Sequence, residues 1–185
     1  FPSSSSLSSS SSSSESNELL SKGGESILFL SNYAFDFSIE QFMLSLFQSN
    51  CLLIYDLQNK DLFNDHAFYL FLNKYKCSYL SGTPSQILQF DLQKITHLNT
   101  ILFSGEKLNK NDFEMIRKRF NKKLINSYGI TEMTVYNTHY IYENNDNKYS
   151  SKIGKLLPNN KAFVLNENLK VLPFNSIGEL YLSGP

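Results

Sequence analysis

The stretch "TILFSGEKLNKNDFEMIRKRFNKKLINSYG", from Thr100 to Gly129, contains two short apolar runs with a helical pattern between them. The runs "TILF" and "KLINS" are bounded by polar residues, which predicts two buried strands. Between them, Phe113, Ile116 and Phe120 recur at helical spacing and predict a helix with one apolar face. A strand, a crossover helix and another strand together predict a pair of parallel strands.

The same alternation extends back to residue 27 and predicts an α/β fold, a mostly parallel sheet flanked by helices. The other predicted strands cover residues 27–35, 51–55 and 77–80, and the other predicted helices cover residues 38–49, 61–76 and 83–90. Two of these helices begin with a capping-box pattern, Ser38 with Gln41 and Thr83 with Gln86. The first of them also carries an apolar stripe formed by Ile39, Phe42, Met43, Leu46 and Phe47.

Polar residues and glycines follow four of the predicted strands. In parallel α/β sheets, ligands bind beyond the carboxyl ends of the strands. We therefore expect a binding site where these residues gather. They are Asp36, Ser81–Gly82, Ser104–Glu106 and Ser127–Gly129.

The pattern changes after Glu143, where a polar loop precedes short alternating runs. These runs predict two strands joined at residues 166–168 and a third strand within residues 177–184, in an antiparallel arrangement. We predict three segments along the chain: a Ser-rich, low-complexity insert or linker over residues 1–26, an α/β part over residues 27–149, and an antiparallel piece over residues 150–185.

The composition narrows the function classes. The 185 residues carry no net charge, which removes the electrostatic argument for a nucleic-acid or anionic-membrane partner. No apolar run is long enough to span a membrane, and the N-terminus lacks a secretory pattern. Cys51 and Cys77 form no CxxC motif and indicate buried thiols in a reduced, cytoplasmic chain. The chain begins with Phe1 rather than Met and stops as a strand finishes, so we expect a fragment.

The segment "NSYGITEMT", residues 126–134, combines residue types that suit nucleotide chemistry. Tyr128 offers a flat face on which a purine can stack, and Gly129 permits close backbone approach to a ligand. Thr131 offers a hydroxyl for a phosphate oxygen, and Glu132 offers a carboxylate for Mg²⁺. Spacing alone favours a plain strand-to-helix turn, with Gly129 as the turn residue and Thr131 as the N-cap, because short glycine turns are common.

Within that segment, "NSYGITE" resembles the Asn-x-Tyr-Gly-Pro-Thr-Glu motif of the adenylate-forming enzymes, most closely the adenylation domains of non-ribosomal peptide synthetases. Four other stretches resemble motifs of the same family, in the same order. They are "FDFSIEQFMLSLFQSNCLLI", "GTPSQ", "LFSGEKL" and "IGKLLPNNKAFVLNENLKVLPFNSIGELYLSG". The resemblance covers residues 27–185 and implies the large N-terminal subdomain of that fold, followed by the start of an antiparallel β-barrel piece.

The resemblance also implies a reaction. A carboxylate attacks the α-phosphate of ATP, giving an acyl-adenylate and pyrophosphate, and the acyl group then passes to a phosphopantetheine thiol on a carrier domain. Thr131 and Glu132 would be the catalytic residues, with Glu132 holding Mg²⁺. The implied partners are the carrier and condensation domains of the parent chain. The positions that would contact ATP are Gly105, Glu106, Asn126, Ser127, Tyr128, Gly129 and Thr131.

Asp36 indicates the class of acid, because the matching Asp of amino-acid-activating members pairs with the substrate ammonium group. A first-turn helix residue that complements the helix dipole is the alternative reading. Glu40 is the other charged residue of the implied pocket; it either pairs with a basic substrate side chain, such as lysine or ornithine, or faces solvent. The positions that match the pocket lining are Asp36, Phe37, Glu40, Ser81, Leu102, Ser104, Ser127, Val135 and Tyr136.

The chain departs from the family pattern at Ile130 and Leu156, where proline is usual. Two alternatives stay open: a fragment of an acyl- or aryl-CoA ligase, and a degenerate binding remnant without activity. The family's phosphate loop, its ribose-binding Asp and its catalytic Lys are expected outside these residues, so we expect the isolated chain to be inactive.

The remaining polar features receive no functional role from the sequence. The three histidines, His66, His97 and His139, share no metal-ligand spacing and are predicted to be surface or hydrogen-bonded residues. The run "RKRF", residues 117–120, predicts a solvated helix face closed by one core aromatic.

Overall fold

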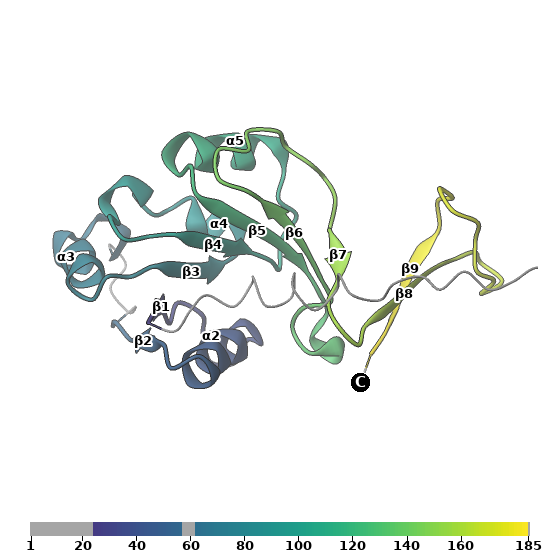
Figure 1. Ribbon diagram of the computed structural model, residues 1–185, viewed down its shortest axis with the longest axis horizontal. Coiled ribbons are helices and arrows are strands. Elements are labelled where there is room, and N and C mark those ends of the chain that lie inside the picture. Colours follow the sequence, from purple (N-terminus) through teal and green to yellow (C-terminus); the bar gives the residue numbers. More distant parts are fainter. Residues whose placement is uncertain (1–23, 57–61, 185) are drawn as a thin grey trace, which may run out of the picture.

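The computed structural model describes residues 24–56 and 62–184. A seven-stranded sheet forms the centre, with strand order β2-β1-β3-β4-β5-β6-β7 (Figure 1). The pairs from β2 to β5 are parallel, whereas β6 and β7 join in antiparallel fashion. These strands are β1 (Ser26–Leu28), β2 (Cys51–Leu53), β3 (Tyr79–Gly82), β4 (Thr100–Phe103), β5 (Lys123–Tyr128), β6 (Thr138–Tyr142) and β7 (Lys155–Leu156). The predicted mostly parallel sheet flanked by helices is confirmed.

Helices cover the two faces of the sheet unequally, with α3, α4 and α5 on one side and α2 on the other (Figure 1). The larger core cluster lies under α3, α4 and α5 and includes Phe68, Ile87 and Phe113. A smaller cluster on the α2 side contains Tyr79 and Leu102. The helices are α2 (Phe37–Phe47), α3 (His66–Lys74), α4 (Pro84–Ile87) and α5 (Lys110–Arg119), with 3-10 turns η1 (Leu62–Asn64), η2 (Leu92–Lys94) and η3 (Thr131–Met133).

Helix α5 follows its sequence pattern closely. The Asn109 side chain accepts a hydrogen bond from the Asp112 amide and caps the helix. Phe113 and Ile116 are buried as predicted. The prediction that the basic run is a solvated face is wrong for Arg117, which is 6% exposed and donates to the carbonyl oxygen of Lys122. Carbonyl oxygens of the loop after the helix accept hydrogen bonds from the guanidinium group, so the Arg117 side chain lies inward rather than in solvent.

The two predicted capping boxes have different outcomes. At α4 both reciprocal bonds are present, between Thr83 and Gln86. The box at α2 is wrong, because the N-cap is Asp36 with no side-chain cap bond, and Gln41 is fully buried. The Gln41 side chain turns instead toward β1 and β3, where backbone and hydroxyl groups need partners.

The predicted apolar stripe of α2 does not pack on the described part of the chain. Its five residues are 41% to 83% exposed, while Ser38, Gln41 and Ser45 are buried. One thiol also departs from its prediction, since Cys51 is exposed on the edge strand β2 and only Cys77 is buried. Within the described ranges, none of the helices has the length and apolar character needed to cross a membrane.

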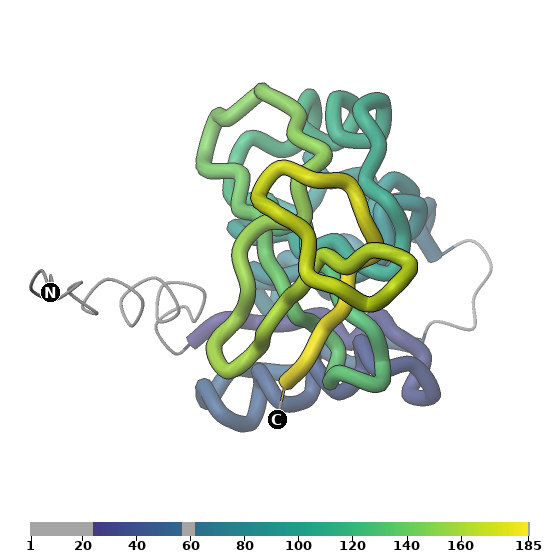
Figure 2. Tube along the Cα trace, turned by 90° about the vertical axis from the view of Figure 1, so that its right-hand side faces the viewer, coloured from purple at the N-terminus to yellow at the C-terminus, as the bar shows by residue number. Residues whose placement is uncertain are grey.

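The last part of the described chain forms a separate two-stranded antiparallel sheet from β8 (Lys161–Leu165) and β9 (Glu179–Ser183). In Figure 1 this hairpin projects beyond β7, and in Figure 2, which looks onto that side, it lies in front of the main sheet. The predicted middle strand is reduced to one isolated bridge between Val171 and Leu165. The three predicted segment boundaries stay predictions.

Candidate functional site

The turn after β5 folds back tightly on itself at the carboxyl edge of the sheet. A Cβ atom at Gly129 would lie 2.1 Å from the Val135 carbonyl oxygen, so only glycine fits there. Thr134 and Val135 both have positive φ, 63° and 67°, and a β-branched residue rarely adopts this conformation. The chain therefore holds the segment after Gly129 in one strained turn, which fixes where Thr131 and Glu132 lie.

A buried amide holds this turn together. Asn137 is fully buried, and its side-chain oxygen accepts from the Ile130 amide. Its side-chain nitrogen donates to the carbonyl oxygen of Met133 and, at 2.8 Å, to the side-chain oxygen of Asn160. Asn137 thus links the turn after β5 to the loop before β8. No pattern in the sequence indicates this role.

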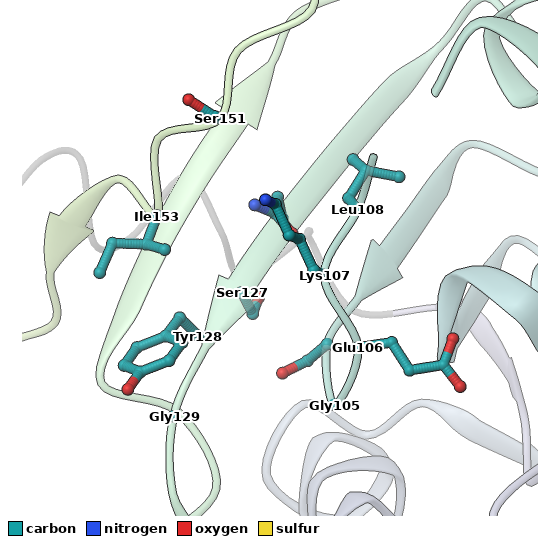
Figure 3. Close-up of a pocket in the computed structure, with 11 residues that line it drawn as sticks. Gly105, Glu106, Lys107, Leu108, Ser127, Tyr128, Gly129, Ser151 and Ile153 are labelled. Carbon is teal, nitrogen blue, oxygen red and sulfur yellow. The ribbon is translucent and has the colours of Figure 1, made fainter. Parts of the chain in front are cut away.

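The larger cavity, about 370 Å³, opens between the β4–α5 loop and the end of β5 (Figure 3). Six of the seven positions implied to contact ATP line it: Gly105, Glu106, Asn126, Ser127, Tyr128 and Gly129. The other lining residues are Ser104, Lys107, Leu108, Ser151 and Ile153. Figure 3 shows the Tyr128 ring on the side of Ile153, and Tyr128 is one of the residues that line the cavity.

Glu106 has a partner in the first turn of α4. Its carboxylate accepts a 2.8 Å hydrogen bond from the Ser85 hydroxyl and a second one from the Ser85 amide. In Figure 3 its side chain extends away from Tyr128. Gly105, beside it, has φ +76°, which lets the loop pass close to the Phe37 ring.

A second cavity of about 270 Å³ brings the two ends of the predicted site together. The Thr131 hydroxyl donates a 2.7 Å hydrogen bond to the Asp36 carboxylate, across 95 residues of sequence. The lining residues are Asp36, Phe37, Ser104, Gly105, Gly129, Ile130, Thr131, Glu132 and Val135. The cavity therefore joins a carboxylate from the start of α2 to a hydroxyl and a carboxylate from η3.

Glu132 is exposed at this cavity and makes no hydrogen bond or ion pair with the residues that the structure describes. The described residues contain no group of three metal-ligating side chains. Magnesium in nucleotide enzymes is commonly held by one or two carboxylates together with phosphate oxygens. A lone carboxylate that faces a cavity fits that kind of site.

Glu40 lies inward, which excludes the solvent-facing alternative. Its Oε1 accepts from the Tyr79 hydroxyl at 2.6 Å, and its Oε2 accepts from the Ser81 hydroxyl at 2.7 Å. Burial raises the pKa of Glu40 to about 7, although both hydrogen bonds act to lower it. The side chain keeps only partial solvent contact and finds its partners within the chain.

Four pocket-lining predictions lie behind the cavities rather than in their walls: Glu40, Ser81, Leu102 and Tyr136. Leu102 is buried in the smaller cluster, and Tyr136 packs edge-on against Phe37 with ring centroids 5.8 Å apart. The Tyr136 hydroxyl is buried without a hydrogen-bond partner among the described atoms. Burial raises the pKa of Tyr136, and the nearby carboxylates Glu40 and Asp36 act in the same direction.

His139 is a site neighbour that the sequence did not indicate. It pairs with Ser127 across β5 and β6, and its Nδ1 lies 2.7 Å from the Ser127 hydroxyl. Burial lowers the pKa of His139 to about 4, so the imidazole is neutral at physiological pH. The prediction that this histidine is a hydrogen-bonded residue rather than a metal ligand agrees with this geometry.

The family profile described as AMP-binding enzyme matches residues 4–185. Among curated proteins, the chain is 42% identical to the N-(5-amino-5-carboxypentanoyl)-L-cysteinyl-D-valine synthase of Amycolatopsis lactamdurans, over 88% of this chain and 4% of that protein. It is 40% identical to the synthase of the same name from Penicillium rubens, over 85% of this chain and 4% of that protein. It is 30% identical to bacitracin synthase 1 of Bacillus licheniformis, over 88% of this chain and 3% of that protein. The chain thus spans a small part of these relatives.

Solved structures share the fold. The N-terminal subdomain of NpsA from Klebsiella oxytoca, in complex with 3-hydroxybenzoyl-AMSN, aligns with a TM-score of 0.74 at 20% identity. The alignment covers 90% of this chain and 44% of that one. An artificial adenylation–PCP fusion of NpsA with ThdA aligns with a TM-score of 0.70 over 86% of this chain and 30% of that one. These matches place the seven-stranded sheet and the following hairpin in one known fold.

Proposed function

Because the chain belongs to the AMP-binding enzyme family, we propose that it is part of an amino-acid-activating adenylation domain of a peptide synthetase. The parent protein, the longer chain that contains these residues, joins a carboxylate to ATP. The carboxylate oxygen forms a bond to the α-phosphorus, the bond to the β-phosphate oxygen breaks, and pyrophosphate leaves. The acyl-adenylate then transfers its acyl group to a phosphopantetheine thiol on a carrier domain.

The observation that carries this proposal is the contact between Asp36 and Thr131 in the smaller cavity. The proposal needs an anion for the substrate ammonium group and phosphate-binding groups within one substrate length of it. Asp36 supplies the anion, and Thr131 and Glu132 stand beside it at the same cavity. A carboxylate and a cation in a partly desolvated cleft form a strong, directional contact.

The neighbouring residues have matching roles in the proposal. Tyr128 offers its ring to the adenine along the larger cavity, while Gly105 and Gly129 allow the backbone to approach the nucleotide. Thr131 exchanges its hydrogen bond to Asp36 for one to a phosphate oxygen when substrates bind. Glu132 would hold Mg²⁺, and that ion would neutralise the charge that gathers on the phosphates. The chain's own contribution is mainly orientation.

The relatives support the partner and the cofactors that we propose. Their names describe peptide synthases, and one structural neighbour is a fusion of an adenylation unit with a carrier unit. We infer ATP and Mg²⁺ as the cofactors, a phosphopantetheine-bearing carrier domain and a condensation domain as partners, and a cytoplasmic location. An acyl- or aryl-CoA ligase leaves Asp36 without a role, and no observation favours it or a degenerate remnant.

The test is amino-acid-dependent ATP–pyrophosphate exchange by the full-length parent protein. Asp36→Asn keeps the size of the side chain and removes its charge. We expect the KM for the amino acid to rise about 10-fold to 100-fold while the KM for ATP changes little. Glu167→Gln, in the exposed turn after β8, is the matched control and should behave as wild type. Equal amino-acid KM values for wild type and Asp36→Asn would remove the basis of the proposal.

A further inference from the structure

A chain of hydrogen bonds between side chains runs behind the smaller cavity. The Gln41 amide donates to the Ser81 hydroxyl at 2.9 Å, and that hydroxyl donates to Glu40 at 2.7 Å. From the other side, the Tyr79 hydroxyl donates to the second Glu40 oxygen at 2.6 Å. Gln41 and Ser81 are fully buried and Tyr79 is buried. The Glu40 carboxylate is thus the common acceptor at the end of two donor paths.

The backbone fixes which atom donates and which accepts along this series of hydrogen bonds. The Gln41 side-chain oxygen accepts from the amides of Leu30 and Ser31, just after β1. Those amides are donors only, so the oxygen of Gln41 must face them and its NH₂ group must face Ser81. The Ser81 hydroxyl accepts from that group and therefore gives its single proton to Glu40. Each polar atom in the path has a defined role, which holds Glu40 in one position.

The walls of the smaller cavity are formed by other side chains. Phe37 and Val135 line it, and the Phe37 ring packs on Tyr136. Glu40 lines neither of the two cavities. The requirement that a buried carboxylate has a partner is met by Tyr79 and Ser81, so a cationic substrate side chain is not needed for it. The group that an amino-acid side chain meets beside Asp36 is aromatic or aliphatic.

The charges at the smaller cavity also restrict which substrate side chain can bind there. The charged residues of the smaller cavity, Asp36 and Glu132, are both acidic, and Glu40 lies behind its wall. An acidic side chain would therefore meet only like charges there, and a cationic side chain finds no free partner, because the proposed function commits Asp36 to the substrate ammonium group and Glu132 to Mg²⁺. The product for which two of the relatives are named contains a carboxylate-bearing acyl group together with cysteinyl and valine units. The last two of these are small and uncharged.

We propose that the side-chain subsite next to Asp36 takes the small uncharged side chain of an α-amino acid, and that Tyr79 and Gln41 are positioning residues that hold Glu40 behind its wall. This inference rests on the proposed function. It replaces the basic substrate, lysine or ornithine, with a substrate of the valine or cysteine type. Tyr79 and Gln41 themselves lie outside both cavities and act through Glu40 and Ser81.

The experiment measures exchange by the full-length parent protein with valine, cysteine, lysine, ornithine and glutamate. We expect kcat/KM for valine or cysteine to exceed that for the three charged amino acids at least about 100-fold, because glutamate would meet like charges and the ammonium group of lysine or ornithine would lose water without a free partner. Tyr79→Phe removes one hydroxyl and should raise the KM for the preferred amino acid about 10-fold, with the KM for ATP unchanged. Tyr75→Phe, an exposed tyrosine at the end of α3, is the matched control and should leave both constants unchanged.

The outcomes separate the inference from the proposed function. If lysine or ornithine is the preferred substrate, the inference is overturned and the adenylation function stands. If Tyr79→Phe changes the constants for ATP and the amino acid equally, Tyr79 is not a positioning residue for the subsite. Gln41→Met, which keeps the length of the side chain, repeats this test from the other end of the path. Exchange with no amino acid at all removes the proposed function and the inference together.

Discussion

Replacing Glu40 by glutamine should change how the free energy of unfolding depends on pH. Burial raises the pKa of Glu40 from its ordinary value of 4.5 to about 7 in the folded state. Between these two values the folded state binds more protons than the unfolded state, so stability falls as the pH rises through this window. The rise corresponds to at most about 3 kcal/mol, present below pH 4.5 and lost above pH 7. Glu40→Gln removes this dependence.

The measurement is denaturant unfolding of the adenylation domain of the parent protein at pH values from 4 to 8. The quantity to compare is the difference in free energy of unfolding between wild type and Glu40→Gln, because the other titrating groups contribute equally to both. The titratable groups that interact with Glu40 are Tyr79 and Tyr136, and both stay protonated over this range because burial raises each pKa. We expect the advantage of wild type to shrink by up to about 3 kcal/mol as the pH rises. A pH-independent difference, or one that grows with pH, would refute a buried Glu40 with a raised pKa.

Three further substitutions test other parts of the structure. Gly129→Ala should cost roughly 2–3 kcal/mol of stability and lower exchange activity, because its methyl group would overlap the Val135 carbonyl; thermal unfolding and exchange measure the two effects. Phe113→Ala should cost about 3–5 kcal/mol in chemical denaturation, since its buried ring packs on Tyr142; a cost below 1 kcal/mol would contradict this packing. Asn137→Ala should cost about 1–3 kcal/mol by leaving the Ile130 amide unpaired. Unchanged stability in the same denaturation assay would contradict this role of Asn137.

The fold was predictable where apolar spacing alone decides structure. The strand at residues 100–103 and the helix with Phe113 and Ile116 inward follow from such spacing. The capping box predicted for α2 failed because Gln41 has stronger partners in β1 and β3, and only the docked helix reveals them. Strand β6 was not predicted, so the position of His139 beside Ser127 could not be predicted either.

The site was predictable in its membership but not in its contacts. The carboxyl-edge rule places Asp36 and Thr131 at the same end of the sheet, yet their direct hydrogen bond depends on the strained turn at Thr134 and Val135. The pairing of Tyr79 and Ser81 with one carboxylate has a partial signal, because alternate residues of a strand face the same side. The inward direction of Glu40 has no such signal, since it depends on the rotation of α2 against the sheet.

The most direct test of the account is ATP–pyrophosphate exchange by the full-length parent protein, with Glu132→Ala beside the control Glu167→Ala. The account predicts exchange that requires an α-amino acid, is lost in Glu132→Ala and persists in the control. Exchange that occurs only with acids lacking an amino group would contradict the role of Asp36. Full exchange by Glu132→Ala would contradict the placement of the nucleotide chemistry at the turn after β5.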